Sequence, residues 1–262
     1  MDRLFDCAFV RRPSNSYVNC VSSNPDRDKI DVTLAKEEHR GYVSILKECG
    51  VKVVELSPLK DFPDSVFMQD PAVLGERYSV IGRFGEATRR GEEKVLVGEL
   101  KTGNVKVGLP IVVQEPGTLE GGDIVVTDQE IFVGQSSRTN SDGARQLAGA
   151  LKARKVISIK TSLFHLLCGC TYLNNRTMLI TPEMVSPSSF PGFKFVTIPK
   201  EETYATDALY LGDRRVLIPL GYPRAKAKLE QAGYKPLETD VSEFYKGDGG
   251  ITCLSSPIYR VF

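Results

Sequence analysis

Gly247-Asp248-Gly249-Gly250-Ile251-Thr252-Cys253 is the stretch around which this 262-residue chain is organised. Its glycines can take positive φ and let the backbone approach a ligand closely. The Ile-Thr-Cys that follows predicts a strand whose first residues present the Cys253 thiol. Two interpretations stay open on this stretch alone: a nucleophile, or a hairpin turn followed by a buried structural cysteine.

The composition excludes several classes of protein. A hydrophobic content of 41% is ample for a core. Lys+Arg of 34 against Asp+Glu of 33 leaves a charge of +1, so no global field attracts nucleic acid or an anionic membrane. The N-terminus carries charges where a signal peptide needs an apolar run, and no stretch reaches the roughly 18 apolar residues of a membrane span. We expect a soluble cytoplasmic protein.

The six cysteines are sparse in a chain of this size, which predicts reduced thiols rather than a disulfide scaffold. Cys168 and Cys170 are one residue apart, closer than zinc ligands usually are, and no second Cys/His pair completes four ligands. We expect both on one buried face of a strand.

The first part of the chain reads as a strand, a loop and a helix-strand unit. Residues 7–10 predict a short buried strand, and residues 11–27 predict a long loop of the kind that often forms a lid. Thr33 is a candidate cap for a helix that runs to about Cys49, with Gly50 as its stop. A strand follows over residues 51–56.

A repeat then emerges. Four segments share the layout of apolar strand, polar turn and apolar strand, each opened by Asp or Thr: residues 70–82, 123–134, 171–181 and 207–219. A helix pattern and one more strand follow most of them, with helices expected over 91–100, 142–154 and 225–232. The third repeat lacks a clear helix.

Self-similarity on this scale indicates radial or stacked repetition. Strands near residues 7 and 254 suggest a fifth unit that the two ends of the chain share. We therefore predict an α/β protein, a five-bladed α/β propeller of ββαβ-like repeats with pseudo-fivefold symmetry, in one domain over residues 1–262. An ordinary mixed α/β sandwich is the alternative.

Candidate reactive residues come from several segments. His39 lies among charges and predicts a solvated residue, whereas His165 has apolar neighbours and is either a core residue or a base. Glu120, in Leu-Glu-Gly-Gly-Asp, is either in a plain turn or orients a histidine across glycines that permit close packing. No dinucleotide or phosphate-binding fingerprint occurs.

Two carboxylates suggest a cation site. Asp64 and Asp70 flank an apolar segment at even spacing, which on a strand places both on one side. Paired carboxylates suit a planar guanidinium, although each also fits a turn. Arg89 and Arg138 read as surface charges unless a carboxylate must be held, and Ser137 to Asn140 at a helix entrance suits an anion.

Together these motifs resemble the dimethylarginine dimethylaminohydrolases of the guanidino-modifying superfamily, which includes arginine deiminases and amidinotransferases. The resemblance runs nearly end to end, and the order and spacing of its motifs agree. The matching segments are Pro63 to Val73, Arg89 to Glu92, Leu119 to Asp123, Phe132 to Asn140, His165-Leu166 and Asp248 to Cys253.

The resemblance implies a five-bladed α/β propeller and a set of residue roles. Cys253 would be the nucleophile, His165 the general acid and base, and Glu120 the carboxylate that orients His165. Asp64 and Asp70, with Gln69 between them, would face the guanidinium. Arg89 and Arg138 would bind the substrate α-carboxylate, and backbone carbonyls near Gly247 would receive the α-amino group.

The implied reaction needs no metal or organic cofactor. A hydrolase of this kind converts an N-methylated arginine or arginine to citrulline and an amine or ammonia, through a covalent thiouronium. The expected partner is a small guanidino amino acid, with neither nucleic acid nor membrane, and a homodimer is one open expectation. An arginine deiminase, an amidinotransferase and a non-catalytic binding propeller are the alternatives.

Two positions depart from the family pattern. Gln69 stands where methylarginine hydrolases usually have Glu, and Arg11-Arg12-Pro13 lacks the apolar leucine of the family's lid. Both concern recognition of the substrate's N-substituent.

Overall fold

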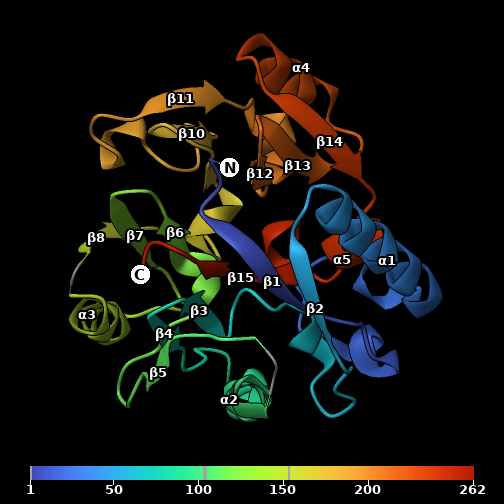
Figure 1. Ribbon diagram of the computed structural model, residues 1–262. Helices are drawn as coiled ribbons and strands as arrows, with labels where there is room; N and C mark the ends of the chain where they lie inside the picture. Colours follow the sequence, from blue (N-terminus) through green and yellow to red (C-terminus); the bar gives the residue numbers. More distant parts are fainter. Residues whose placement is uncertain (1, 103–104, 153) are drawn as a thin grey trace.

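The computed structural model describes residues 2–102, 105–152 and 154–262 (Figure 1). Its strands are β1 (Phe5–Arg11), β2 (Lys52–Leu56), β3 (Ala72–Gly75), β4 (Tyr78–Ile81), β5 (Leu109–Val112), β6 (Ile124–Val126), β7 (Glu130–Gln135), β8 (Lys155–Lys160), β9 (Cys170–Tyr172), β10 (Thr177–Ile180), β11 (Lys194–Thr197), β12 (Leu209–Gly212), β13 (Arg215–Pro219), β14 (Lys235–Thr239) and β15 (Ser255–Tyr259). Its α-helices are α1 (Val32–Glu48), α2 (Glu92–Thr102), α3 (Ser141–Ala150), α4 (Pro223–Gln231) and α5 (Ser242–Tyr245).

These strands form three-stranded units with one pairing scheme, in which two antiparallel strands are followed by a parallel third. The units are β3-β4-β5, β6-β7-β8, β9-β10-β11, β12-β13-β14 and β15-β1-β2. The last unit combines both ends of the chain, as the repeat predicts. A further pairing of β15 with β3 merges two units into one six-stranded sheet. In Figure 1 the units succeed one another around the middle of the view, with α1, α2, α3 and α4 outside them.

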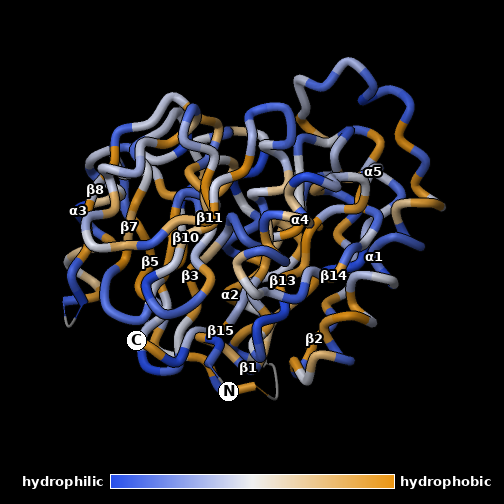
Figure 2. The backbone as a smooth tube through the Cα atoms, turned by 90° about the horizontal axis from the view of Figure 1, so that it is seen from above, coloured by the Kyte–Doolittle hydropathy of each residue, from blue (hydrophilic) through white to orange (hydrophobic). Residues whose placement is uncertain are grey.

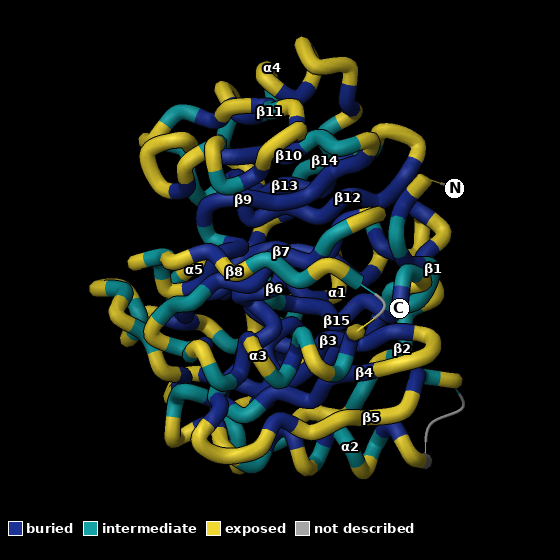
Figure 3. The backbone as a smooth tube through the Cα atoms, turned by 90° about the vertical axis from the view of Figure 1, so that its left-hand side faces the viewer, coloured by how far each residue is buried: buried dark blue, intermediate teal, exposed yellow. Residues whose placement is uncertain are grey.

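Alternation along the strands explains how the units pack. Ile124 and Val126 of β6 belong to the apolar cluster shared with β3 and β4, while Val125 between them belongs to the cluster shared with β9 and β10. Successive side chains of a strand point to opposite faces, so one strand serves two neighbouring cores. Figure 2 shows apolar and polar segments alternating along the chain. In Figure 3 the strands β6, β7 and β13 are buried, whereas the outer strand β5 is exposed.

The mixed α/β class and the helices of the repeats are confirmed. The third unit has only a short 3₁₀ turn where its neighbours have a helix, as expected. Helix α1 ends at Glu48, and Gly50, with a φ of 75°, is the expected stop just beyond it, but Thr33 is not its cap. Asp31 has that role, because its carboxylate accepts the N–H groups of Thr33 and Leu34.

Four local predictions are wrong. His39 is buried, because it lies on the inner face of α1 despite its charged sequence neighbours. Cys168 lies in a 3₁₀ turn that precedes β9, so only Cys170 is a strand residue. The segment from Asp64 starts as a 3₁₀ turn, and Cys253 also lies in such a turn, two residues before β15 begins.

None of the helices in the described ranges is sufficiently long and apolar to span a membrane.

Candidate active site

The site is built from one position of the repeat. In each unit the residue two places before the first strand lines the same pocket: Asp70, Gly122, Cys168, Asp207 and Cys253. The sequence placed Asp123 and Thr171 in register with Asp70, so its alignment of the second repeat is wrong by one residue and that of the third by three. Equivalent backbone positions converge because every unit presents the same edge to the pocket.

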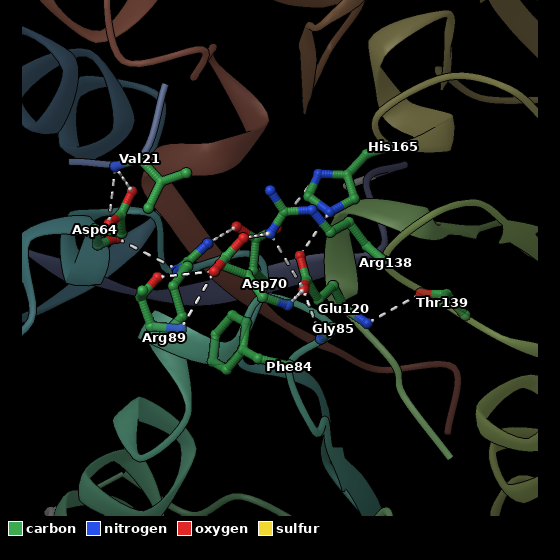
Figure 4. A network of polar contacts seen from close by, with 12 residues as sticks. Val21, Asp64, Asp70, Phe84, Gly85, Arg89, Glu120, Arg138, Thr139 and His165 are labelled. Carbon is green, nitrogen blue, oxygen red and sulfur yellow. Dashed lines mark hydrogen bonds and ion pairs between the residues drawn. The ribbon is translucent and has the colours of Figure 1, made fainter. Parts of the chain in front are cut away.

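The pocket is closed by the loop between β1 and α1. Its volume is about 30 Å³. The backbone N–H of Val21 donates to both carboxylate oxygens of Asp64, at 3.1 and 3.2 Å (Figure 4). Ser23 donates its backbone N–H and its hydroxyl to Asp248, at 2.6 and 3.0 Å. The loop is therefore fastened beside the pocket at two points, Asp64 and Asp248.

His165 and Glu120 form a buried pair. Nε2 of His165 lies 2.9 Å from Oε2 of Glu120, and the other carboxylate oxygen accepts the backbone N–H of Gly85 at 2.9 Å. Nδ1 of His165 remains on the side of Asp70, 3.8 Å from its Oδ1. Burial alone would lower the pKa of His165, but Asp70 and then the Glu120 hydrogen bond raise it to about 9. The imidazole is thus protonated at neutral pH.

Gly122 makes this arrangement possible. A Cβ on Gly122 would lie 2.5 Å from Nδ1 of His165 and 2.9 Å from Oδ1 of Asp70, closer than packed atoms allow. The glycines of the Leu-Glu-Gly-Gly-Asp motif thus serve close packing, which is one of their two proposed roles.

Asp70 has one committed oxygen and one free oxygen. Oδ2 accepts Nη1 of Arg89 at 2.5 Å, while Oδ1 is buried without a hydrogen-bond partner. A buried acceptor without a hydrogen-bond partner destabilises the fold. A ligand that donates a hydrogen bond to Oδ1 of Asp70 would remove this cost. Asp70, Glu120 and His165 also place ligand atoms within 4.8 Å of one another, a spacing that a metal ion could bridge.

Arg89 is fully engaged in the protein. Its Nε and Nη2 donate to the two oxygens of Glu92 at 3.0 and 2.9 Å, and Nη2 also lies 3.3 Å from two backbone carbonyls. The ring of Phe84 lies under the guanidinium, 4.4 Å from centroid to Cζ. Arg89 could therefore bind a substrate carboxylate, as the sequence predicts, only with N–H groups that already donate to Asp70 and Glu92.

Arg138 is the freer arginine. Its Nη1 lies 3.7 Å from carboxylate oxygens of Glu86 and Glu120, beyond hydrogen-bond distance. Its guanidinium stacks on Phe164, 4.3 Å from the ring centroid, and Phe164 is a half-exposed aromatic at the pocket. Its donors are thus available for an anion.

Cys253 faces carboxylates, and no cation of the described residues contacts its Sγ directly. Its Sγ lies 3.8 Å from Oδ2 of Asp207. Burial, then Asp207 and Asp70, raise the pKa of the Cys253 thiol well above its usual value. The thiol is therefore neutral when the pocket holds no cation.

The glycine-rich loop has a different local geometry from the predicted one. The residue with positive φ is Asp248, at 58°, and not one of its neighbouring glycines. Gly250 is required for space, because a Cβ there would collide with Oδ2 of Asp207.

Gln69 lies off the pocket. Its side chain is buried and its amide donates to the carbonyl oxygen of Gly121 at 3.2 Å, and Gln69 lines a separate internal cavity together with Tyr259. The change from Glu to Gln therefore removes no charge from the pocket wall.

The remaining sequence candidates converge. The pocket lining includes Asp64, Asp70, Arg89, Arg138, His165, Gly247 and Cys253. Sequence reasoning missed Asp207, although that residue opens the fourth repeat and so carried a signal. It also missed Glu92 and Val21, whose contacts with Arg89 and Asp64 have no signature in the sequence.

Comparison with known proteins gives consistent similarities. The family model described as "N,N dimethylarginine dimethylhydrolase, eukaryotic" matches residues 8–188. The chain is 41% identical to an uncharacterised protein of Aeropyrum pernix, over 99% of this chain and 98% of that protein. It is 36% identical to the N(G),N(G)-dimethylarginine dimethylaminohydrolase of Pseudomonas aeruginosa, over 96% of this chain and 99% of that protein.

A solved structure shares the whole fold. This is a cysteine-to-serine variant of the Pseudomonas aeruginosa enzyme in complex with citrulline. It superposes with a TM-score of 0.90 at 33% identity, covering 98% of this chain and all of that one.

Proposed function

The chain belongs to the dimethylarginine dimethylaminohydrolase family and is a hydrolase of C–N bonds, and we propose that it converts an N-methylated arginine to citrulline and an amine with Cys253 as nucleophile. The observation that carries the proposal is the free Oδ1 of Asp70, buried between Arg89 and His165. A guanidinium supplies the missing donor and a compensating positive charge.

Substrate binding comes first. The guanidinium takes the place of the Val21 N–H at Asp64 and donates to Oδ1 of Asp70, and the two carboxylates fix its plane. Arg138 binds the α-carboxylate, since its guanidinium has no closer partner than 3.7 Å. Arg89 mainly holds Asp70 in position, and carbonyls near Gly247 receive the α-amino group.

The chemistry then proceeds in two steps. The bound cation lowers the pKa of Cys253, the thiol proton leaves to solvent, and the thiolate attacks the guanidinium carbon. Protonated His165 gives its proton to the departing methylated amine, so the C–N bond breaks and an S-alkylthiouronium remains. His165, now neutral, takes a proton from water, whose oxygen bonds to the same carbon. The C–S bond then breaks, the departing Cys253 sulfur takes up the remaining hydroxyl proton, and citrulline is released from the regenerated thiol.

The raised pKa of His165, about 9, suits the first step. An imidazolium at neutral pH is a general acid before it is a base. Glu120 stabilises that charged form and fixes the ring through Nε2, which leaves Nδ1 for the reacting groups.

Gln69 is the main departure from the pattern of the methylarginine hydrolases, and it lies outside the pocket. Its replacement of Glu therefore gives no reason to expect another substrate, and we propose that methylated arginines are preferred over arginine. We also propose that the repeated units are the five blades of an α/β propeller and that residues 1–262 form one domain. The two-sided packing of β6 supports this arrangement.

The test supplies dimethylarginine, monomethylarginine, arginine and agmatine separately and identifies citrulline and each released amine. We expect dimethylamine and citrulline from dimethylarginine, and no product from the Cys253→Ser variant. Cys7→Ser, which changes a cysteine of β1 away from the pocket, is the matched control. Citrulline production by Cys253→Ser at the wild-type rate would falsify the proposal, and ammonia from arginine alone would identify the deiminase instead.

A further inference from the structure

Asp207 is a buried carboxylate that the proposed reaction leaves unused, and we infer that it is a positioning residue for the nucleophile. It fixes the turn that carries Cys253 and keeps Sγ protonated until a cationic substrate enters. The inference rests on the proposed function, because it takes Cys253 as the nucleophile.

The two oxygens of Asp207 contact consecutive residues. Oδ1 accepts the backbone N–H of Thr252 at 2.7 Å, and Oδ2 lies 3.8 Å from Sγ of Cys253, within the reach of a weak S–H donor. Only 6% of Asp207 is exposed, so solvent hardly screens this contact. Because one carboxylate holds both the backbone and the thiol, the direction of Sγ is set before substrate binds.

The repeat explains why Asp207 faces Cys253. Asp207 lies two residues before β12, and Cys253 lies two residues before β15 in the neighbouring unit. The two units share an apolar cluster that includes Leu209 of β12 and Leu254 of the Cys253 turn. Gly250 leaves the space that Asp207 fills.

Within the part of the chain that the structure describes, the titratable groups around this pair add no cation in contact with Sγ. Asp70 and Cys168 lie near enough to raise the pKa of Cys253. Tyr42 and Tyr204 lie near enough for Asp207 to raise their pKa, but their hydroxyls bond to Ser255 and to the Gly249 carbonyl. Arg89, Arg138 and His165 line the same pocket, but their nitrogens face Asp70, Glu92, Glu86 and Glu120.

The charge state follows from burial and from these neighbours. Burial raises the pKa of Asp207 to about 6, so it is mostly ionised at pH 7. A carboxylate beside the thiol disfavours the thiolate and raises the pKa of Cys253. A bound guanidinium offsets Asp207 and Asp70, and the thiolate then forms in the complex. The empty enzyme is thereby protected from electrophiles.

The experiment measures the alkylation of Cys253 without substrate. The wild-type protein and Asp207→Asn are treated with iodoacetamide from pH 6 to pH 10, and the modified Cys253 peptide is quantified by mass spectrometry. Asparagine retains an oxygen for the Thr252 N–H. We expect the apparent pKa of Cys253 to fall by about one unit, which makes alkylation at pH 7 about tenfold faster.

Asp123→Asn is the matched control. Asp123 is also buried, with a pKa raised to about 6. Its carboxylate accepts hydrogen bonds from the Ser136 hydroxyl and the Leu166 backbone N–H, and it does not line the pocket. We expect its alkylation profile to follow that of the wild type. If Asp207→Asn does not fold, Asp207→Ser removes the charge with a smaller side chain, and its profile must shift in the same direction.

A profile of the folded Asp207 variant that superposes on the wild type overturns the inference, as does an equal shift in Asp123→Asn. Because no substrate is present, the result stands whether or not the protein hydrolyses methylarginine.

Discussion

The backbone N–H of Val21 bridges both oxygens of Asp64, at 3.1 and 3.2 Å, and so occupies the carboxylate that the substrate guanidinium is proposed to use. The loop thus satisfies a buried carboxylate when the pocket is empty, and the same contact must break when substrate enters. Closure and binding compete for one group.

The hydrogen bonds between Ser23 and Asp248 are the second contact that holds the loop, and weakening them is expected to loosen the Val21–Asp64 contact as well. Asp248→Asn weakens the acceptor of both Ser23 hydrogen bonds, since a neutral amide oxygen accepts less strongly than a carboxylate. We expect hydrogen exchange at the Val21 and Ser23 amides to become about tenfold faster, which corresponds to roughly 1.4 kcal/mol. Asp26→Asn, in the exposed Asp26–Lys29 pair of the same loop, is the control and is expected to leave exchange unchanged. Equal exchange rates in the wild type and both variants would contradict the proposal that Asp248 holds the loop.

Removing the charge of Glu120 is expected to move the pH dependence of turnover. In Glu120→Gln the pKa of His165 falls from about 9, because the carboxylate that favours the imidazolium is gone. The general acid is then lost at lower pH, so the alkaline limb of the kcat profile shifts downward and kcat at pH 7 falls about 100-fold. Kinetics from pH 6 to pH 10 and the NMR titration of His165 check this. An unchanged alkaline limb argues against His165 as the acid.

Arg138 is expected to determine the preference for an α-carboxylate. Loss of a charge-assisted contact costs about 2 kcal/mol, so Arg138→Gln should raise KM for dimethylarginine about 30-fold with little change in kcat. With a guanidino compound that lacks the carboxylate, such as agmatine, KM should not change. A similar loss for both compounds would instead indicate damage to the Glu120 side of the pocket, which lies 3.7 Å away.

Arg89 is expected to behave as a structural residue first. Arg89→Met leaves Asp70 and Glu92 buried without the guanidinium that pairs with both of them. Breaking a buried ion pair from one side costs about 3–5 kcal/mol, measured as the free energy of unfolding in urea. Arg83→Met, which removes a guanidinium paired with the exposed Glu115, is the control and is expected to cost less than about 1 kcal/mol. Equal losses contradict the buried network.

Glu38 is expected to make stability depend on pH. Burial raises its pKa from 4.5 to about 7, so ionisation of Glu38 destabilises the fold above pH 7 and this cost disappears as pH falls toward 4.5. Its carboxylate caps α5 by accepting the Ser242 hydroxyl and the Glu243 N–H. Glu38→Gln keeps an acceptor, so we expect a higher thermal midpoint at pH 8 and a weaker dependence between pH 5 and pH 8. Glu37→Gln, on the exposed side of α1, should leave both unchanged.

The repeat could be predicted from the sequence because it depends on the pattern of neighbouring residues. Alternating apolar residues, turn residues and one extra strand recur at fixed order, and each unit builds the same hairpin from residues close in the chain. The shared fifth unit followed from the strands left over at the two ends. The register between repeats was harder to predict, since Asp123 lies one residue after Gly122, which is the position that lines the pocket.

The sequence by itself determined the α/β class and the repeated unit, because periodicity is a property of neighbouring residues, and its resemblance to a known family supplied the candidate reactive residues. Only the tertiary structure decided which charges meet. The Val21–Asp64 contact joins residues 43 apart and the Asp207–Cys253 contact joins residues 46 apart. His39 is buried for the same reason, because the burial of a helix face depends on what packs against it and not on its neighbours in sequence.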